Sequence, residues 1–276
     1  MTPTATAVGC SSIINISGAG FAAAGAGLVP VCSIGELSTG AVVVVNDSLV
    51  SCKPPGPAFA TTAALRLDFG GATASHPDVM TLFVVYEAAA FTPFSILPVG
   101  GRYNLQMAVT LVGSGFTNFG APRCRFGSFE GDPGVVINST HLSCSKPRFP
   151  DSERISLGGY SVAIAANGQC YSAPSVQFTT YNSQLDSIDV FGAPSTSSIN
   201  LTMTGEGFVT PVLLGAVCEF QMPVSSTTIT TIRTALTTLS SSSASCPTPA
   251  GGTVGTWSVS VLQNGLTAEH TVSEDS

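Results

Sequence analysis

The sequence predicts an all-β protein built from three tandem β-sandwich domains, and three observations support that fold class. The tetrapeptide Gly-x-Gly-Phe occurs three times, beginning at Gly18, Gly113 and Gly205, which lie 95 and 92 residues apart. A pair of cysteines follows each copy: Cys32 with Cys52, Cys124 with Cys144, and Cys218 with Cys246. Short runs of alternating apolar and polar residues recur between turn residues, as in half-buried strands. The repeat is as long as one small domain and far longer than a solenoid unit.

The middle copy shows the order of elements most clearly. Met107, Val109 and Leu111 alternate with their neighbours and should share the buried face of one strand. The motif glycines that follow permit positive φ, and Phe116 should enter the core. Asn167-Gly168 is a strong hairpin turn signal. The strands that we expect in this copy cover residues 106–112, 123–126, 135–144, 160–164 and 176–181.

The flanking copies repeat this pattern with substitutions that keep the apolar face. The residues expected to face the core are Leu65, Leu67 and Phe69 in the first copy and Trp257, Val259 and Val261 in the third. The first two copies close with a Phe-x-x-Tyr strand at 83–86 and 178–181, whereas the third lacks it, so its closing strand is predicted to be missing. We therefore predict domains at 1–86, 87–181 and 182–276. The short connections between them predict a semi-rigid, elongated array.

Charge is unusually sparse. Charged residues make up 9% of the chain, against about 25% in ordinary soluble domains. The net charge is −7 with only nine basic residues, which argues against nucleic acid as a partner. A chain that is 44% hydrophobic and so weakly charged is poorly protected against association. We expect its surface to be covered by glycans or by neighbouring subunits.

The eight cysteines indicate an oxidising, extracellular or cell-surface location, because six of them recur at matched positions. A metal site is not expected: there is no Cys-x-x-Cys, and His76, His141 and His270 fall at unrelated repeat positions. No segment is apolar enough to insert in a membrane. The first residues lack the basic start and apolar stretch of a signal peptide, so we expect either a removed signal or a piece of a longer chain.

The middle copy resembles the IPT/TIG domain, an immunoglobulin-like fold found in plexins, fibrocystin-like proteins and many protist surface proteins. The matching segments are 94–101, 109–116, 124–127, 138–144 and 160–164. The resemblance covers essentially the whole chain, with a shortened opening in the first copy and a long Ser/Thr loop in the third. It implies three immunoglobulin-like sandwiches. IPT/TIG relatives that bind DNA use basic loops, and these are absent here.

The cysteines and asparagines are the residues with the clearest expected roles. We expect each matched cysteine pair to form a disulfide that closes a short loop and stabilises its domain by roughly 3 kcal/mol. Cys10 and Cys170 have no counterparts, so they should pair with each other or with another chain. Pairing with each other would require the first two domains to fold back. A disulfide between subunits is therefore the sharper hypothesis.

Four Asn-x-Ser/Thr sequons are candidate N-glycosylation sites: Asn15, Asn46, Asn138 and Asn200. A chain this rich in Ser and Thr yields some sequons by chance. However, Asn46 and Asn138 both lie six residues before the second cysteine of their pair, and we expect at least two of the four to be occupied. The stretch from Ser225 to Ser245 is either a mucin-like O-glycosylated loop or a polar surface insertion.

No catalytic constellation is evident, so we expect no enzymatic activity and no cofactor apart from covalent glycans. The acidic residues are scattered, and no nucleophile elbow or phosphate-binding loop occurs. Gly-x-Gly-Phe lacks the following glycine and the strand-to-helix context of a dinucleotide site. A carbohydrate-binding module would need an exposed aromatic platform, and the single tryptophan, Trp257, is expected to face the core.

These observations favour an extracellular glycosylated structural protein, a homo-oligomer in the form of an open head-to-tail filament. Sparse charge, two unmatched cysteines and a missing closing strand favour this function, because a neighbour's strand can fill an incomplete sheet. Residues 2–6 are one candidate for the donated segment. The alternative is an ectodomain fragment of a cell-surface adhesion or signalling receptor, in which the array is a stalk.

Overall fold

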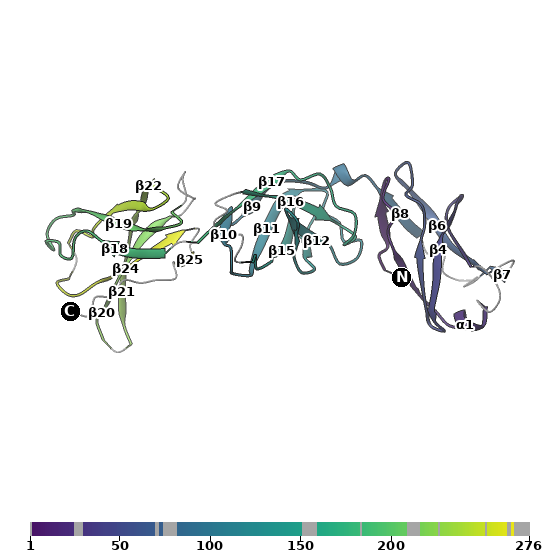
Figure 1. Ribbon diagram of the computed structural model, residues 1–276, viewed down its shortest axis with the longest axis horizontal. Helices are drawn as coiled ribbons and strands as arrows, with labels where there is room; N and C mark the ends of the chain where they lie inside the picture. The colour runs from purple at the N-terminus through teal and green to yellow at the C-terminus, as the bar shows by residue number, and fades with distance from the viewer. Residues whose placement is uncertain are drawn as a thin grey trace. The chain divides into compact units, whose positions relative to one another are not determined.

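The computed structural model is built almost entirely of β-strands (Figure 1). It describes residues 2–24, 30–69, 72–73, 82–150, 159–182, 184–208, 216–225, 227–251, 253–263 and 266–267. Helical structure in these residues is limited to α1 (Phe21–Ala24) and the 3-10 turn η1 (Ala88–Ala90). The all-β, immunoglobulin-like sandwich prediction is confirmed, except that the short helical turns were not expected.

The chain packs as two compact units. The first comprises Met1–Ile96, Ala108–Pro147 and Ser161–Val176, and the second comprises Leu97–Met107, Arg148–Tyr160 and Gln177–Ser276. This division runs through the middle sequence repeat, so the division into three domains remains a prediction. We use first, second and third repeat for residues 1–86, 87–181 and 182–276.

In the first repeat, one strand belongs to both layers of the sandwich. The strand order is β1-β8-β6-β3-β4-β5-β2, with β7 paired to β6. Residues 37–40 of β4 pair with β3, and residues 41–46 pair with β5, so β4 passes from one layer to the other. The strands are β1 (Ala5–Ala7), β2 (Ile14–Ser17), β3 (Val31–Ile34), β4 (Leu37–Asn46), β5 (Leu49–Lys53), β6 (Thr61–Phe69), β7 (Ala72–Thr73) and β8 (Leu82–Tyr86).

The second repeat forms two sheets, with orders β10-β17-β16-β12-β13 and β14-β15-β11-β9. The single strand expected at 135–144 is wrong: it is a hairpin of β14 and β15, because a side-chain-stabilised turn interrupts it at residues 138–140. The strands are β9 (Thr92–Leu97), β10 (Gly100–Arg102), β11 (Met107–Ser114), β12 (Arg123–Phe126), β13 (Phe129–Glu130), β14 (Val135–Asn138), β15 (His141–Lys146), β16 (Gly159–Ala165) and β17 (Val176–Tyr181).

The third repeat forms sheets with orders β18-β19-β23-β22 and β21-β20-β24-β25. The Ser/Thr stretch is not a loop, because β21 continues a regular ladder with β20 and its residues alternate between exposed and half-buried. Where the closing strand was predicted to be missing, β25 pairs antiparallel with β24, and residues 268–276 lie outside the described part. The strands are β18 (Gln184–Ile188), β19 (Asn200–Glu206), β20 (Val217–Pro223), β21 (Ile229–Ala235), β22 (Thr237–Ser240), β23 (Ser243–Pro247), β24 (Ser258–Gln263) and β25 (Leu266–Thr267).

The Gly-x-Gly-Phe motif is a tight turn that delivers its aromatic ring to the core. The three motif phenylalanines are all buried, at 7%, 3% and 1% exposure for Phe21, Phe116 and Phe208. The second glycine of each motif has a positive φ: 79° at Gly20, 78° at Gly115 and 71° at Gly207. Such values favour glycine because a Cβ is disfavoured there.

Candidate functional site: the Cys10–Cys170 junction and the outer edge strands

The three matched cysteine pairs are bonded in the structure, and each bond joins the two layers of one sandwich. The bonds connect Cys32 on β3 to Cys52 on β5, Cys124 on β12 to Cys144 on β15, and Cys218 on β20 to Cys246 on β23. The Cα–Cα separations are 6.2, 6.0 and 6.4 Å, in that order. All six side chains are buried. They therefore act as staples inside the core, and they stabilise each sandwich mainly by constraining the unfolded chain.

Cys144 and Cys246, the second cysteines of the later pairs, lie at matching positions in their sandwiches. Cys144 is 2% exposed on β15, and Cys246 is 1% exposed on β23. Each of these strands pairs on one side with an edge strand, β14 or β22, and on the other with the strand that leads into the Gly-x-Gly-Phe turn. The loop that each bond closes differs in length, with sequence separations of 20 and 28 residues. The longer separation in the third repeat accommodates β21, which is an ordered strand.

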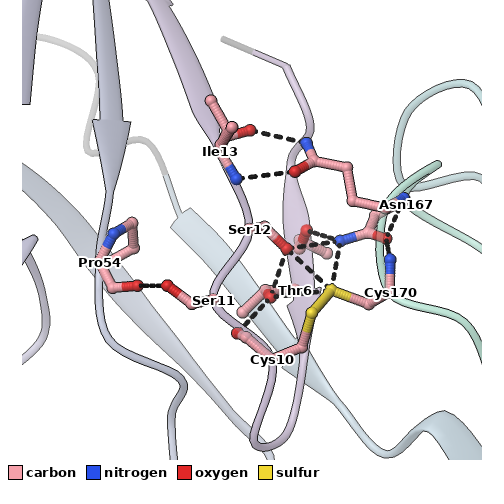
Figure 2. Close-up of a disulfide and its surroundings, with 10 residues drawn as sticks. Thr6, Cys10, Ser11, Ser12, Ile13, Pro54, Asn167 and Cys170 are labelled. Carbon is pink, nitrogen blue, oxygen red and sulfur yellow. Dashed lines mark hydrogen bonds between the residues drawn. A yellow bond between two sulfur atoms is a disulfide. The ribbon is translucent and has the colours of Figure 1, made fainter. Parts of the chain in front are cut away.

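Cys10 and Cys170 form a disulfide with each other within one chain. This is one of the two expected pairings, and the alternative that was favoured, a disulfide between subunits, is not the one found. The Cα atoms of the two residues are 6.1 Å apart. Cys10 follows β1, and Cys170 follows the Asn167-Gly168 turn after β16 (Figure 2). Both belong to the same compact unit. No folding back is needed, because the loop after β1 already lies against this hairpin of the second repeat.

A buried polar cluster surrounds this disulfide (Figure 2). The Asn167 Nδ2 group donates to Ser12 Oγ at 2.8 Å and to the Ala5 carbonyl at 3.1 Å. The hydroxyls of Thr6 and Ser12 are 2.6 Å apart. Asn167 Oδ1 accepts from the backbone N–H of Cys170 at 2.9 Å. Asn167, Thr6 and Ser12 are each at most 2% exposed. Their polar groups cannot reach water, so these hydrogen bonds supply the partners that buried polar groups need.

Gln169 extends this contact, because its side-chain amide pairs with the Ile13 backbone as a neighbouring strand would. Its Oε1 accepts from the Ile13 N–H at 2.7 Å, and its Nε2 donates to the Ile13 carbonyl, also at 2.7 Å. A side-chain amide thus pairs with the donor and acceptor of one exposed backbone residue. The contact is specific to this pair of segments, because both groups of Ile13 are engaged at once.

The closing tyrosines of the first two repeats are buried near hairpins further along the chain. Tyr86 stacks on Phe119 and meets Phe91 edge-on, with both centroid separations 5.0 Å. Burial raises the pKa of Tyr86, and the backbone of Asn167 offsets part of that rise. Tyr181 donates its hydroxyl to the Gln263 carbonyl at 2.8 Å. Sequence reasoning used these tyrosines only as strand markers and did not predict their contacts with Phe119 and Gln263.

The four sequon asparagines are all exposed. Asn46 and Asn138 occupy the same turn in two repeats. Asn138 Oδ1 accepts from both the N–H and the hydroxyl of Thr140, each at 2.8 Å, and Asn46 Oδ1 accepts from the same two groups of Ser48, each at 2.9 Å. In both turns, the Nδ2 that would carry a glycan is left outside these bonds. Asn15 and Asn200 lie on strands β2 and β19.

The third repeat builds the same turn without a sequon. Ser240 takes the asparagine position, and its hydroxyl accepts from the Ser242 N–H at 3.2 Å. Like Asn46 and Asn138, Ser240 lies six residues before the second cysteine of its pair, here Cys246. The turn therefore belongs to the repeat, whereas the glycan acceptor belongs only to the first two copies.

Each of these turns ends a strand that has an outward apolar face. We call residues 42–46 of β4, together with β14 and β22, the outer edge strands, because in the described ladders each pairs with a neighbour on one side only. Large apolar side chains on them are more than half exposed: Val43 59%, Val45 54%, Val135 65%, Ile137 59% and Leu239 58%. An apolar edge strand is a template for pairing with another chain.

Other candidate chemistry is sparse in the part of the chain that the structure describes. No group of three or more His, Cys, Asp or Glu side chains gathers there to hold a metal ion. None of the helices found there has the length and apolarity to cross a membrane. Trp257 differs from expectation, because it is only partly buried: it packs on the core and also lines a cleft.

No protein-family model matches the chain, and no curated protein sequence does either. Among solved structures, the full extracellular region of plexin A4 aligns with this chain at 13% identity and a TM-score of 0.46. The alignment covers 97% of this chain and 21% of the plexin A4 chain. The Escherichia coli adhesin FdeC aligns at 13% identity, with coverages of 96% and 86% and a TM-score of 0.29. The chain thus spans about a fifth of the plexin A4 chain.

Proposed function

We propose that this chain is an extracellular glycosylated structural protein of IPT/TIG-like domains, a subunit that assembles into fibres through contacts between copies. Four disulfides support an oxidising location outside the cell. The observation that carries the assembly proposal is the recurrence of an outward apolar edge strand in every repeat. Free soluble domains usually protect such edges with charge, and this chain has little charge to use.

The edge at β22 is the one that we assign to contact with a second copy. Glycans at Asn46 and Asn138 would cover the ends of the other two outer edge strands, whereas Ser240 leaves β22 without a sequon. Leu239 projects outward from it. Pairing of β22 with a different edge of the next copy extends without closing and gives an open filament, whereas pairing with itself gives a closed dimer.

Residues 2–6 do not support the idea of a donated segment. Residues 5–7 form β1, which pairs in parallel with β8, and Thr2 forms an antiparallel bridge with Asn15. This segment is therefore used within its own sandwich. The contact between copies is expected to use an edge strand that already belongs to a folded repeat.

Negative-stain electron microscopy of the purified, glycosylated protein tests the proposal. Regular fibres are expected for the natural sequence. Ser240→Asn adds a sequon at the turn beside β22, so a glycan there should leave isolated particles, whereas the matched Ser240→Ala variant should still form fibres. Isolated particles of the natural protein at every concentration would refute assembly and favour a receptor-stalk function. Closed dimers would refute the open filament.

A further inference from the structure

The third repeat contains a cleft of about 430 Å³ at one end of its sandwich. Its walls come from the connection between β18 and β19 and from the connection between β23 and β24. Val190, Phe191 and Pro194 line it from the first connection, and Val254, Thr256 and Trp257 line it from the second, with Trp257 immediately before β24. Phe191 is 67% exposed and Val254 is 85% exposed. Three aromatic side chains, Phe191, Trp257 and the buried Phe220, line the cleft, which is open to solvent at Phe191 and Val254.

The second repeat shows that this space is not required by the fold. Tyr160 and Trp257 are equivalent, because each precedes by four residues the strand position that pairs with the first cysteine of its repeat. In the second repeat, the preceding loop supplies Phe149, which is 1% exposed and stacks on Tyr160 with a centroid separation of 4.4 Å. The corresponding loop of the third repeat is shorter and has no aromatic residue. That loop therefore supplies no ring to Trp257 in the way that Phe149 covers Tyr160.

The lining of the cleft indicates the chemistry of its ligand. None of the described residues that line it carries a charge, which disfavours anionic and cationic ligands. Most of its lining is apolar, and four lining residues carry hydroxyls: Ser195, Thr248, Thr253 and Thr256. Thr253 and Thr256 are exposed. The Trp257 indole N–H donates to the Thr253 carbonyl at 3.3 Å, which fixes the ring against this loop. A fixed aromatic face with hydroxyls at its border suits a ligand with an apolar face and a polar rim.

We propose that this cleft binds a neutral sugar residue of a glycan. A pyranose ring has one face of C–H bonds, which would lie against Trp257 and Phe191, and a rim of hydroxyls, which would reach Thr253 and Thr256. The chemistry is the same whether the sugar belongs to a free polysaccharide or to an N-glycan on another copy. The site goes beyond fibre assembly and does not depend on it.

The single tryptophan of the chain makes a direct test available, because all indole fluorescence reports on this cleft. The folded protein is titrated separately with neutral oligosaccharides of mannose, glucose, galactose and N-acetylglucosamine. At least one should shift or quench the Trp257 emission in a saturable way. Phe191→Ala should weaken that affinity at least about tenfold. The matched control is Phe94→Ala, since Phe94 is also 67% exposed but lies on β9, outside the cleft.

Two further measurements separate the outcomes. Thermal unfolding of Phe191→Ala should match that of Phe94→Ala, so a loss of binding reports on the site and not on the fold. Immobilised protein is also exposed to glycosylated and to enzymatically deglycosylated copies: binding of the glycosylated copies alone identifies the N-glycan as the source. The proposal is overturned if none of the four oligosaccharides changes the emission, or if Phe191→Ala binds as tightly as Phe94→Ala.

Discussion

The two glycines of each Gly-x-Gly-Phe motif meet different constraints. The second glycine has a positive φ, as described for Gly20, Gly115 and Gly207. The first is closely approached: a Cβ at Gly113 would meet the Thr92 carbonyl and the Phe116 ring, and one at Gly205 would meet the Gln184 carbonyl. The first position therefore requires glycine because of close packing, and the second requires it because of its backbone conformation, with close packing added at Gly115.

Gly115→Ala should destabilise the protein by about 1–3 kcal/mol, or more. A methyl group there is strained by the positive φ and would also meet the Ala90 carbonyl. Gly192→Ala is the control, because nothing lies within 4 Å of its Cβ position. Urea unfolding of the two variants provides the measurement. Equal midpoints for both would show that the motif turn does not depend on glycine.

Tyr171 should titrate late. Its ring lies under the Arg125 guanidinium at 4.3 Å, and its hydroxyl donates to Glu130 Oε1 at 3.0 Å. Burial, followed by the hydrogen bond to Glu130, raises the pKa of Tyr171 from 10.0 to about 12. The neutral phenol is the favoured form, so the contribution of Tyr171 to stability is complete below pH 10 and is lost as the pH rises towards 12.

The ultraviolet difference titration between the natural protein and Tyr171→Phe measures this pKa. The tyrosinate absorbance that the variant lacks should be missing at pH 10 and should appear on approach to pH 12. A difference signal that already reaches half its final value at pH 10 would show that the hydroxyl is not held by Glu130. The control is denatured protein, in which the difference should appear near pH 10.

Sequence reasoning found the residues whose partners recur with the repeat, and it missed those without a counterpart. The matched cysteines and motif glycines could be predicted because the same residues recur at equivalent positions in all three repeats. The roles of Thr6, Ser12 and Asn167 could not, because each makes a contact with a segment more than 150 residues away, and these contacts occur once. Nothing in local pattern or spacing marks such a contact.

The sequon turn is the element that couples local structure to modification. Asn138→Asp keeps two acceptor oxygens for the Thr140 N–H and hydroxyl but removes the amide that a glycan needs. Asn138→Ala removes both. The alanine variant should therefore be less stable than the aspartate variant by about 1 kcal/mol.

Mass spectrometry and thermal unfolding separate the two effects. Both variants should lose the same glycan mass, and only Asn138→Ala should lose the turn bonds. The comparison is made on enzymatically deglycosylated material, so that the sugar does not contribute to stability. Equal stability of the two variants would contradict the stabilising role assigned to Asn138 Oδ1, and an unchanged mass would show that this sequon is unoccupied.

Element boundaries show what alternation alone can predict. The strands of the middle copy were placed correctly where apolar residues alternate without interruption, as in β11 and β12. The expected strand at 135–144 failed, because a turn held by one asparagine side chain leaves the alternation almost intact on both sides. The Ser/Thr stretch failed for the opposite reason: its composition suggested a loop, while its ladder with β20 makes it a strand.

For the whole molecule, the disulfide between Cys10 and Cys170 predicts a covalently closed monomer. Peptide mapping without reduction should recover a linked peptide that contains both residues, and non-reducing electrophoresis should show no covalent dimer. A dimer band that disappears in the Cys170→Ser variant would contradict this prediction and support a disulfide between subunits.

The all-β fold class was predictable from the sequence. The contact between the loop after β1 and the turn after β16, which joins the first two repeats, was not. Each sandwich can be inferred from its own strands, because burial within a repeat is periodic in the sequence. This contact is made by polar side chains in the loop after β1 and in the hairpin after β16. Because such residues are common in ordinary turns, their sequence does not indicate the contact. Their proximity is a property of the folded first unit, which no single repeat encodes.

The junction disulfide also decides how tension would travel through the chain. If the chain is pulled from its two ends, the load reaching Cys10 crosses the sulfur bridge to Cys170, 160 positions further along. The first repeat and most of the second are then bypassed and cannot be stretched out. Reduction would release roughly 55 nm of hidden contour length, which single-molecule force spectroscopy resolves. Under such a load, this bond would act as a mechanical bypass, so that most of the tension between the ends is carried by the residues after Cys170.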